Sequence, residues 1–137
     1  QLFEKIYRGP VMNALGRFGE EYTARWLQDS GCTVLEHSWR HGHGEIDLIV
    51  LEEETLAFVE VKTRSPNYLV RPAEAVGAAK RRKLIETAMY YVLEHPEYAG
   101  LQPRFDVMEI VAEPAGDTWR ILDQAYWKGA FDINGSV

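Results

Sequence analysis

Hydrophobic and polar residues alternate along residues 44–64, which read GEIDLIVLEEETLAFVEVKTR. Aliphatic and β-branched residues at every second position are typical of a β-strand, and an acidic run at residues 52–54 interrupts them where a turn would fit. The pattern therefore predicts two strands joined as a hairpin.

Charged side chains gather on one face of this predicted hairpin. Successive side chains of a strand point to opposite sides of a sheet, so Glu45 and Asp47 share a face of the first strand. On the second strand, Glu60, Lys62 and Arg64 share a face for the same reason. If the two registers match, carboxylates of both strands and the ammonium group of Lys62 project from one surface, and the opposite surface is apolar.

Two other segments have the periodicity of an amphipathic α-helix. Residues 13–30 follow Asn13, which can cap a helix, and precede Gly31, which can end one. Residues 72–94 start at Pro72, in the favoured first turn, and stop before Pro96. The apolar stripes expected on the two helices are Leu15, Phe18, Tyr22 and Trp26 on the first, and Ala75, Ala79, Ile85, Ala88, Tyr91 and Val92 on the second.

Three further strands are predicted at residues 32–39, 104–112 and 118–124, with a turn at residues 113–117 between the last two. Helices and strands follow one another without an internal repeat, which favours a compact α/β domain. Asp106 and Glu109 lie an odd number of positions apart, so they cannot share a strand face, and we leave both out of the candidate site.

The chain has the size of one ordinary domain, with 137 residues of which 46% are hydrophobic. We expect a single domain over residues 1–137, with an N-terminal lead-in at residues 1–12 and a C-terminal tail at residues 127–137. The final stretch AYWKGAFDINGSV, residues 125–137, is interpreted as a docked segment that leads into this loose tail. No apolar run reaches the roughly 18 to 20 residues of a membrane span, and no signal-peptide core is present near the start. Together with the single cysteine, Cys32, this predicts a cytoplasmic protein that does not enter a membrane.

The charge of the chain is unfavourable for binding phosphates, since the formal net charge is −6 and the isoelectric point is about 5.2. The excess of acidic side chains is not spread evenly along the chain, which makes binding to phosphates less unfavourable near the candidate site. Residues 1–83 carry 12 basic and 12 acidic side chains, whereas residues 84–137 carry 3 and 9. The densest basic cluster is Lys80, Arg81, Arg82 and Lys83. We therefore expect weak non-specific affinity for nucleic acid, and a protein partner is a candidate source of additional binding.

The acidic pair Asp47 and Glu60 suggests metal chemistry. Two carboxylates held close together repel each other, so such a pair either raises one pKa or binds a hard cation. Mg²⁺ or Mn²⁺ needs only one or two protein carboxylates, and Lys62 would then sit beside a metal-bound water. The alternative from the residues alone is a solvent-facing sheet with Glu/Lys cross-strand pairs, and the pattern ExD followed by ExK does not choose between the two.

Several segments together resemble a known family. These are GRFGEEYTARWLQDSGCTVLEHSWR, then GEIDLIV, FVEVKTR, a lysine-bearing helix and RFDVMEI. They are similar to the YraN-like family of small, uncharacterised bacterial proteins, which look like members of the PD-(D/E)xK nuclease superfamily, close in pattern to archaeal Holliday-junction resolvases. The resemblance implies a restriction-endonuclease-like α/β fold with a central mixed β-sheet flanked by helices.

The resemblance also implies roles for individual residues. Asp47 matches the metal-binding aspartate of the superfamily, Glu60 the acid that follows it, and Lys62 the catalytic lysine. Glu20 matches a further acidic residue that completes the metal site in the resolvase-like branch. The one departure is Ile46, which stands where the motif often has proline.

The expected function is that of a metal-dependent endonuclease acting on nucleic acid, with DNA and branched or repair intermediates as the first candidates. Two alternatives remain: a non-catalytic nucleic-acid or protein interaction module, and an RNA-processing nuclease. A homodimer would suit a two-fold substrate such as a junction. Expected contributors besides the motif residues are the Val61 carbonyl as a metal ligand, Lys80, Arg64, Arg40 and His43 in substrate binding, and Glu45 in support.

Two other sets of residues carry alternative chemistry. His41 and His43 alternate beside the acids and suggest zinc, but structural zinc usually takes four ligands and no second Cys or His pair has a suitable spacing. A glycine-flanked loop that touches substrate is the preferred interpretation. Tryptophan side chains can stack on bases, as they do in single-strand binders. The four candidates are Trp26, Trp39, Trp119 and Trp127, of which Trp26 lies on a predicted core stripe.

Overall fold

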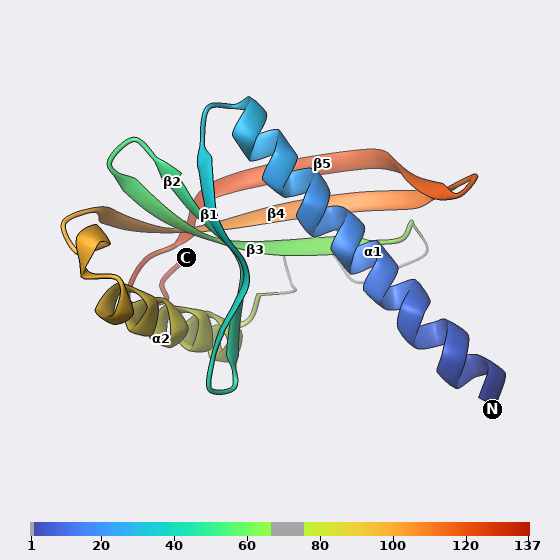
Figure 1. Ribbon diagram of the computed structural model, residues 1–137, viewed down its shortest axis with the longest axis horizontal. Helices are drawn as coiled ribbons and strands as arrows, with labels where there is room; N and C mark the ends of the chain where they lie inside the picture. The colour runs from blue at the N-terminus through green and yellow to red at the C-terminus, as the bar shows by residue number, and fades with distance from the viewer. Residues whose placement is uncertain (1, 67–75) are drawn as a thin grey trace.

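A computed structural model of the protein describes residues 2–66 and 76–137, with side chains from residue 14 onward. Its elements are α1 (Leu2–Asp29), β1 (Thr33–His41), β2 (Gly44–Glu52), β3 (Thr55–Arg64), α2 (Ala78–Glu94), the short 3-10 helix η2 (Pro96–Tyr98), β4 (Gln102–Ala115) and β5 (Thr118–Phe131). The strands in the described part of the chain form one sheet of five, in the order β1-β2-β3-β4-β5 (Figure 1).

The sheet is mixed. Neighbouring strands are antiparallel except β3 and β4, which are parallel. Parallel neighbours need a long crossover connection, and α2 lies in the segment that links them. The predicted α/β class, with a central mixed sheet and flanking helices, is confirmed, and the arrangement is consistent with a restriction-endonuclease-like fold.

The two helices cover opposite faces of the sheet, as the alternation along β3 shows. Leu56 and Phe58 pack in the same buried cluster as Leu84 and Tyr91 of α2. The alternate residues of the same strand, Ala57 and Val59, pack in a second buried cluster with Ala24 and Leu27 of α1. In Figure 1, α1 crosses the long strands while α2 lies beside the β1–β2 hairpin. No helix in the described residues is both long and apolar enough to cross a membrane.

Helix α1 is longer than the sequence pattern predicts. It begins at Leu2 and not at residue 13, so Asn13 is not its cap and the expected lead-in at residues 1–12 is helical from Leu2 on. Asparagine inside a helix costs less than about 1 kcal/mol, so a potential cap need not stop the helix. The C-terminal end is as predicted: Gly31 adopts a φ of 94°, and the Cys32 N–H donates to the Leu27 carbonyl at 3.0 Å.

Helix α2 ends at Glu94 as predicted, but its start differs from the prediction. The predicted first turn at residues 72–75, with Ala75 of the stripe, lies outside the described residues, and Gly77 is the N-cap. Ala79 is exposed, because apolar contact between the helix and the sheet begins only at Leu84. The fully buried positions of the helix are Leu84, Thr87, Ala88 and Tyr91.

The hairpin of β2 and β3 is confirmed, with its turn at Glu53 and Glu54. The last strand was predicted too short, because β5 continues to Phe131 and residues 127–131 are strand and not tail. Phe105 pairs with Phe131 and Val107 with Trp127, so three residues of β5 stand opposite one residue of β4. This β-bulge breaks the alternation of apolar and polar residues, so the sequence pattern does not show that the strand continues to Phe131.

Candidate active site

The end of the β2–β3 ladder brings Asp47 and Glu60 together. The last ladder pair is Leu48 with Val59, and the same register places Asp47 opposite Glu60. Beyond this point the Val61 N–H donates to the Asp47 carboxylate at 2.8 Å. The strands thus separate where two acids face each other, on the side of the sheet that α2 covers. The predicted register match is confirmed.

Two lysines neutralise Glu60. Its Oε2 atom lies 2.9 Å from Lys62 Nζ and 3.1 Å from Lys80 Nζ, and its side chain is only 5% exposed. Lys62 comes from the next outward position of the same strand, as the predicted alternation requires. Lys80 comes from α2, where it shares a helical face with Leu84 and Thr87 because these residues lie four and seven positions on. Within the basic cluster, Lys80 forms the ion pair with Glu60, and Lys83 lines the same region of the surface.

The two carboxyl groups have opposite electrostatic environments. Burial, followed by the charge of Glu60 nearby, raises the pKa of Asp47 to about 8. Burial would also raise the pKa of Glu60, but its ion pairs with Lys62 and Lys80 outweigh burial and hold that pKa below its ordinary value. The metal-free site therefore holds a carboxylic acid beside a carboxylate. A divalent cation would replace the proton on Asp47, which is the behaviour of an acidic pair built for a hard metal.

Glu20 reaches this region because α1 approaches β3 closely. A Cβ atom on Gly19 would lie 1.9 Å from Thr63 Oγ1, so only glycine permits this approach. Glu20 accepts a hydrogen bond from Ser38 Oγ at 3.1 Å. Burial raises the pKa of Glu20, and its charge contributes to the raised pKa of Asp47. Glu20 thus lies within electrostatic range of the acidic pair.

The donor set fits magnesium better than zinc. In residues 14–66 and 76–137, whose side chains the structure describes, no group of three or more His, Cys, Asp or Glu side chains is arranged to hold a metal ion. Zinc would need such a group, whereas Mg²⁺ keeps several waters and needs only one or two carboxylates. Asp47 and Glu60 supply two. The Val61 carbonyl as a third ligand stays a prediction, while the Val61 N–H orients Asp47.

A second close approach fixes α2 over the site. A Cβ atom on Gly44, at the start of β2, would lie 1.9 Å from Thr87 Oγ1. Thr87 is buried, and its hydroxyl donates to the Lys83 carbonyl at 2.7 Å. The helix therefore rests directly on the strand that carries Asp47. A cavity of about 220 Å³ opens beside the acids, and its lining residues are His43, Gly44, Glu45, Asp47, Glu60, Lys80, Lys83 and Leu84.

The other predicted site residues fall into different positions. His43 and Glu45 line the cavity, as their proximity in sequence suggests. Arg40 is exposed and pairs with Glu45 across the hairpin at 2.5 Å, so it lies at the outer edge. Arg64 is the last residue of β3, two positions beyond Lys62. His41 does not join His43: its ring stacks on Tyr90 with centroids 4.0 Å apart.

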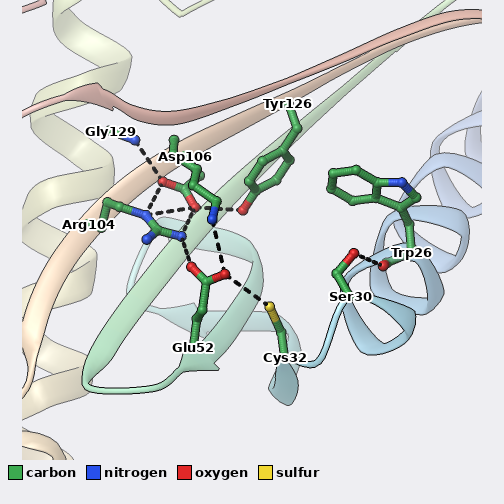
Figure 2. Close-up of polar contacts among 9 residues, drawn as sticks. Trp26, Ser30, Cys32, Glu52, Arg104, Asp106, Tyr126 and Gly129 are labelled. Carbon is green, nitrogen blue, oxygen red and sulfur yellow. Dashed lines mark hydrogen bonds and ion pairs between the residues drawn. The ribbon is translucent and has the colours of Figure 1, made fainter.

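Sequence reasoning missed a buried polar cluster on the α1 side of the sheet, drawn in Figure 2. Asp106 is 1% exposed and accepts hydrogen bonds from Arg104, from the Tyr126 hydroxyl at 2.6 Å and from the Gly129 N–H at 2.9 Å. Arg104 also reaches Glu52 at 2.9 Å. The signal was available, because Arg104 and Asp106 are opposite charges two positions apart and flank a buried Phe105 on the strand. Their bonds hold strands together and leave the Asp106 carboxylate fully engaged.

Comparisons with known proteins agree with one another. A family model described as "Uncharacterised protein family UPF0102" matches residues 19–110, a range that contains Glu20, Asp47, Glu60, Lys62 and Lys80. A UPF0102 protein of Treponema pallidum (strain Nichols) is 39% identical over 100 residues, which cover 73% of this chain and 79% of that protein. One from Syntrophotalea carbinolica is 39% identical over 122 residues, covering 89% and 94%. One from Synechococcus sp. (strain JA-3-3Ab) is 37% identical over 133 residues, covering 95% and 98%.

Proposed function

The chain belongs to the uncharacterised protein family UPF0102, and from the geometry of its site we propose that it is a divalent-metal-dependent endonuclease. It would hydrolyse phosphodiester bonds of nucleic acid, with DNA as the first candidate. The observation that carries the proposal is the pair of buried, adjacent carboxyl groups with two lysines on one of them. A surface sheet with ordinary Glu/Lys pairs would leave its acids solvated and would not raise the pKa of one to about 8.

The residues that would hold the metal are Asp47, Glu60 and the Val61 carbonyl, and Glu20 would contribute its charge from within electrostatic range of the pair. When bound, Mg²⁺ or Mn²⁺ would supply a Lewis acid that screens charge on the phosphate and promotes ionisation of a water. The buried setting of the two acids would strengthen that electrostatic contribution, because water does not screen it there.

The two lysines suit different tasks. The Lys62 side chain is 16% exposed and that of Lys80 is 47% exposed. Lys62 is therefore held in place, and it would orient the attacking water and stabilise its developing negative charge. Lys80 has room to leave Glu60 once a cation neutralises that carboxylate, and it would then bind the scissile phosphate.

The test is cleavage of labelled duplex, flap, four-way-junction and single-stranded DNA, and of RNA, with Mg²⁺ or Mn²⁺. Wild type should cut at least one substrate and Asp47→Asn should cut none, because Asn removes a charged ligand but keeps the side-chain shape. The matched control is Glu54→Gln, which changes an exposed acid at the tip of the same hairpin. Cleavage by Asp47→Asn at the wild-type rate would remove the site from the proposal.

Calorimetric titration of Mg²⁺ or Mn²⁺ into the same proteins tests metal binding independently of cleavage. Wild type and Glu54→Gln should bind the metal, and Asp47→Asn should bind it at least about tenfold more weakly, because a neutral amide replaces a carboxylate ligand. Folded wild-type protein that neither binds metal nor cuts any substrate would favour the interaction module over the enzyme.

A further inference from the structure

A second cavity, of about 240 Å³, lies on the same face of the sheet as the acidic site. Glu60 pairs with Val107 and Lys62 with Glu109 across β3 and β4, and both β4 residues line this cavity. Its full lining is Val76, Arg81, Val107, Glu109, Trp127, Ala130, Phe131 and Val137. The cavity is therefore displaced from the acids by one to two strand spacings, about 5 to 10 Å.

An exposed tryptophan forms one wall of this cavity. Trp127 is 54% exposed, and it sits in β5 between the partly buried Tyr126 and the exposed Lys128. Trp127 lies on the α2 face because it pairs with Val107 of that face, and the bulge in β5 separates it from Phe131, which pairs with Phe105 on the same face. Asp106 fixes the bulge from the opposite face by accepting the Gly129 N–H at 2.9 Å. The aromatic wall is thus held by the fold and is open to a ligand.

The cavity also has one acidic group in an apolar wall. Burial raises the pKa of Glu109, and a hydrogen bond from the Trp127 side chain partly offsets the effect of burial. At the other side, Arg81 is fixed by two backbone carbonyls, Val76 and Gly135, each at 2.8 Å. An exposed indole face, apolar walls and a single carboxyl acceptor suit a flat aromatic ligand that carries an amino group.

We propose that this cavity binds the unpaired base of a nucleotide beside the scissile phosphate, with Trp127 stacking on the base and Glu109 accepting a hydrogen bond from its exocyclic amine. The position of the phosphate rests on the proposed function. A base inside a duplex has its amine engaged in pairing and its faces covered by neighbours, so it must leave the stack to enter. The substrate class is therefore nucleic acid with an unpaired base next to the cut, such as a flap, a junction or a single strand.

The test is fluorescence anisotropy of labelled strands in EDTA, where metal-dependent cleavage cannot occur. The strands are oligodeoxycytidylate, oligothymidylate and an abasic strand of equal length and charge. Wild type should bind the cytidine strand most tightly, because thymine has no exocyclic amine and the abasic strand has no base. Trp127→Ala should bind the cytidine strand about 5- to 150-fold more weakly, the range expected for one lost base-stacking contact.

Three further variants separate base stacking by Trp127 from hydrogen bonding by Glu109 and provide a control outside the cavity. Trp127→Phe should recover most of the affinity, because it keeps an aromatic face. Glu109→Gln should reduce the preference for cytidine over thymidine without affecting the abasic strand. Tyr90→Ala, which removes a 40% exposed aromatic residue of α2 outside the cavity, should bind as wild type does.

Equal affinity of wild type for the cytidine and abasic strands would overturn the proposal, and so would wild-type affinity in Trp127→Ala. These results leave the proposed nuclease activity untouched, since cleavage is measured separately. Conversely, Trp127-dependent binding by a protein that cuts nothing with Mg²⁺ or Mn²⁺ would support the base site while overturning the proposed function.

Discussion

Asp47 and Glu60 stand opposite each other at the point where two strands leave their ladder, so each depends on the charge state of the other. Glu60 keeps its charge because two lysines contact it. Asp47 accepts the Val61 N–H and is hydrogen-bonded to Glu60, and its pKa rises to about 8 because of burial and the charge of Glu60. The pair is therefore strained electrostatically without metal, and substitutions at the two positions should have different consequences.

Asp47→Asn should abolish metal binding without destabilising the metal-free fold. Asparagine resembles the protonated acid, and its side-chain oxygen can still accept the Val61 N–H, so no buried donor loses its partner. In EDTA near neutral pH, we expect the melting temperature to equal or exceed that of wild type. Thermal unfolding followed by circular dichroism measures this, and a clear loss of stability in EDTA would mean that the Asp47 carboxylate has a structural role.

Lys62→Met should separate chemistry from metal binding. The substitution keeps most of the apolar side chain but removes the charge beside the reacting water. On whichever substrate wild type cuts, single-turnover cleavage should slow by about 10²- to 10⁴-fold, the usual contribution of a positioned acid–base group. Mg²⁺ affinity should not fall, because a cation that competes for Glu60 is gone. An unchanged cleavage rate would exclude Lys62 from the mechanism.

At the scale of elements, two glycines determine where the helices meet the sheet. Gly19 lets α1 approach β3 and so places Glu20, and Gly44 lets α2 approach the start of β2 and so places Lys80. In both cases the side chain on the other element is a threonine, Thr63 or Thr87, whose hydroxyl occupies the space that a Cβ would need. The site is thus assembled by two close contacts, each between a glycine and a threonine side chain, and neither contact involves Asp47 or Glu60 directly.

Gly19→Ala should destabilise the protein and displace α1, whereas Gly16→Ala on the same helix should not. Overpacking of a close contact typically costs about 1–3 kcal/mol. Nothing lies within 4 Å of a Cβ at Gly16, so alanine there should stabilise by up to about 1 kcal/mol through helix propensity. Urea unfolding of the three proteins measures both effects. Equal stability of the two variants would show that α1 can shift on β3 without cost.

The elements also show what the sequence could and could not predict. The hairpin and the face shared by Glu60 and Lys62 follow from a period of two, which local sequence carries directly. The start of α1 was missed because a capping residue is also tolerated inside a helix. The bulge near Gly129, and with it the wall formed by Trp127, depends on contacts with Asp106 from another strand, which no local pattern reports.

On the scale of the whole molecule, the two faces of the sheet have separate tasks. The α2 face carries the acids, the lysines and both cavities. The α1 face carries a second polar cluster, in which Glu52 of the β2–β3 hairpin joins β4 and β5 (Figure 2). Glu52 bonds Arg104 at 2.9 Å and Lys128 at 3.0 Å, and the Cys32 thiol points at the same carboxylate. This cluster links the hairpin that carries the site to the strands that carry the tryptophan.

Glu52→Gln should lower stability at neutral pH and have no effect in acid. The hydrogen bond from Lys128, then that from Arg104, holds the pKa of Glu52 below its ordinary value of 4.5. A carboxyl group with a lowered pKa contributes stability that is fully present above its unfolded-state pKa and is lost as the pH falls through the folded-state pKa. Because these pairs are partly exposed, we expect a loss of about 1 kcal/mol and about 3 °C at pH 7. Melting curves at pH values from 7 downward measure it, and a difference that does not shrink as the pH falls below 4.5 would attribute the effect to packing and not to charge.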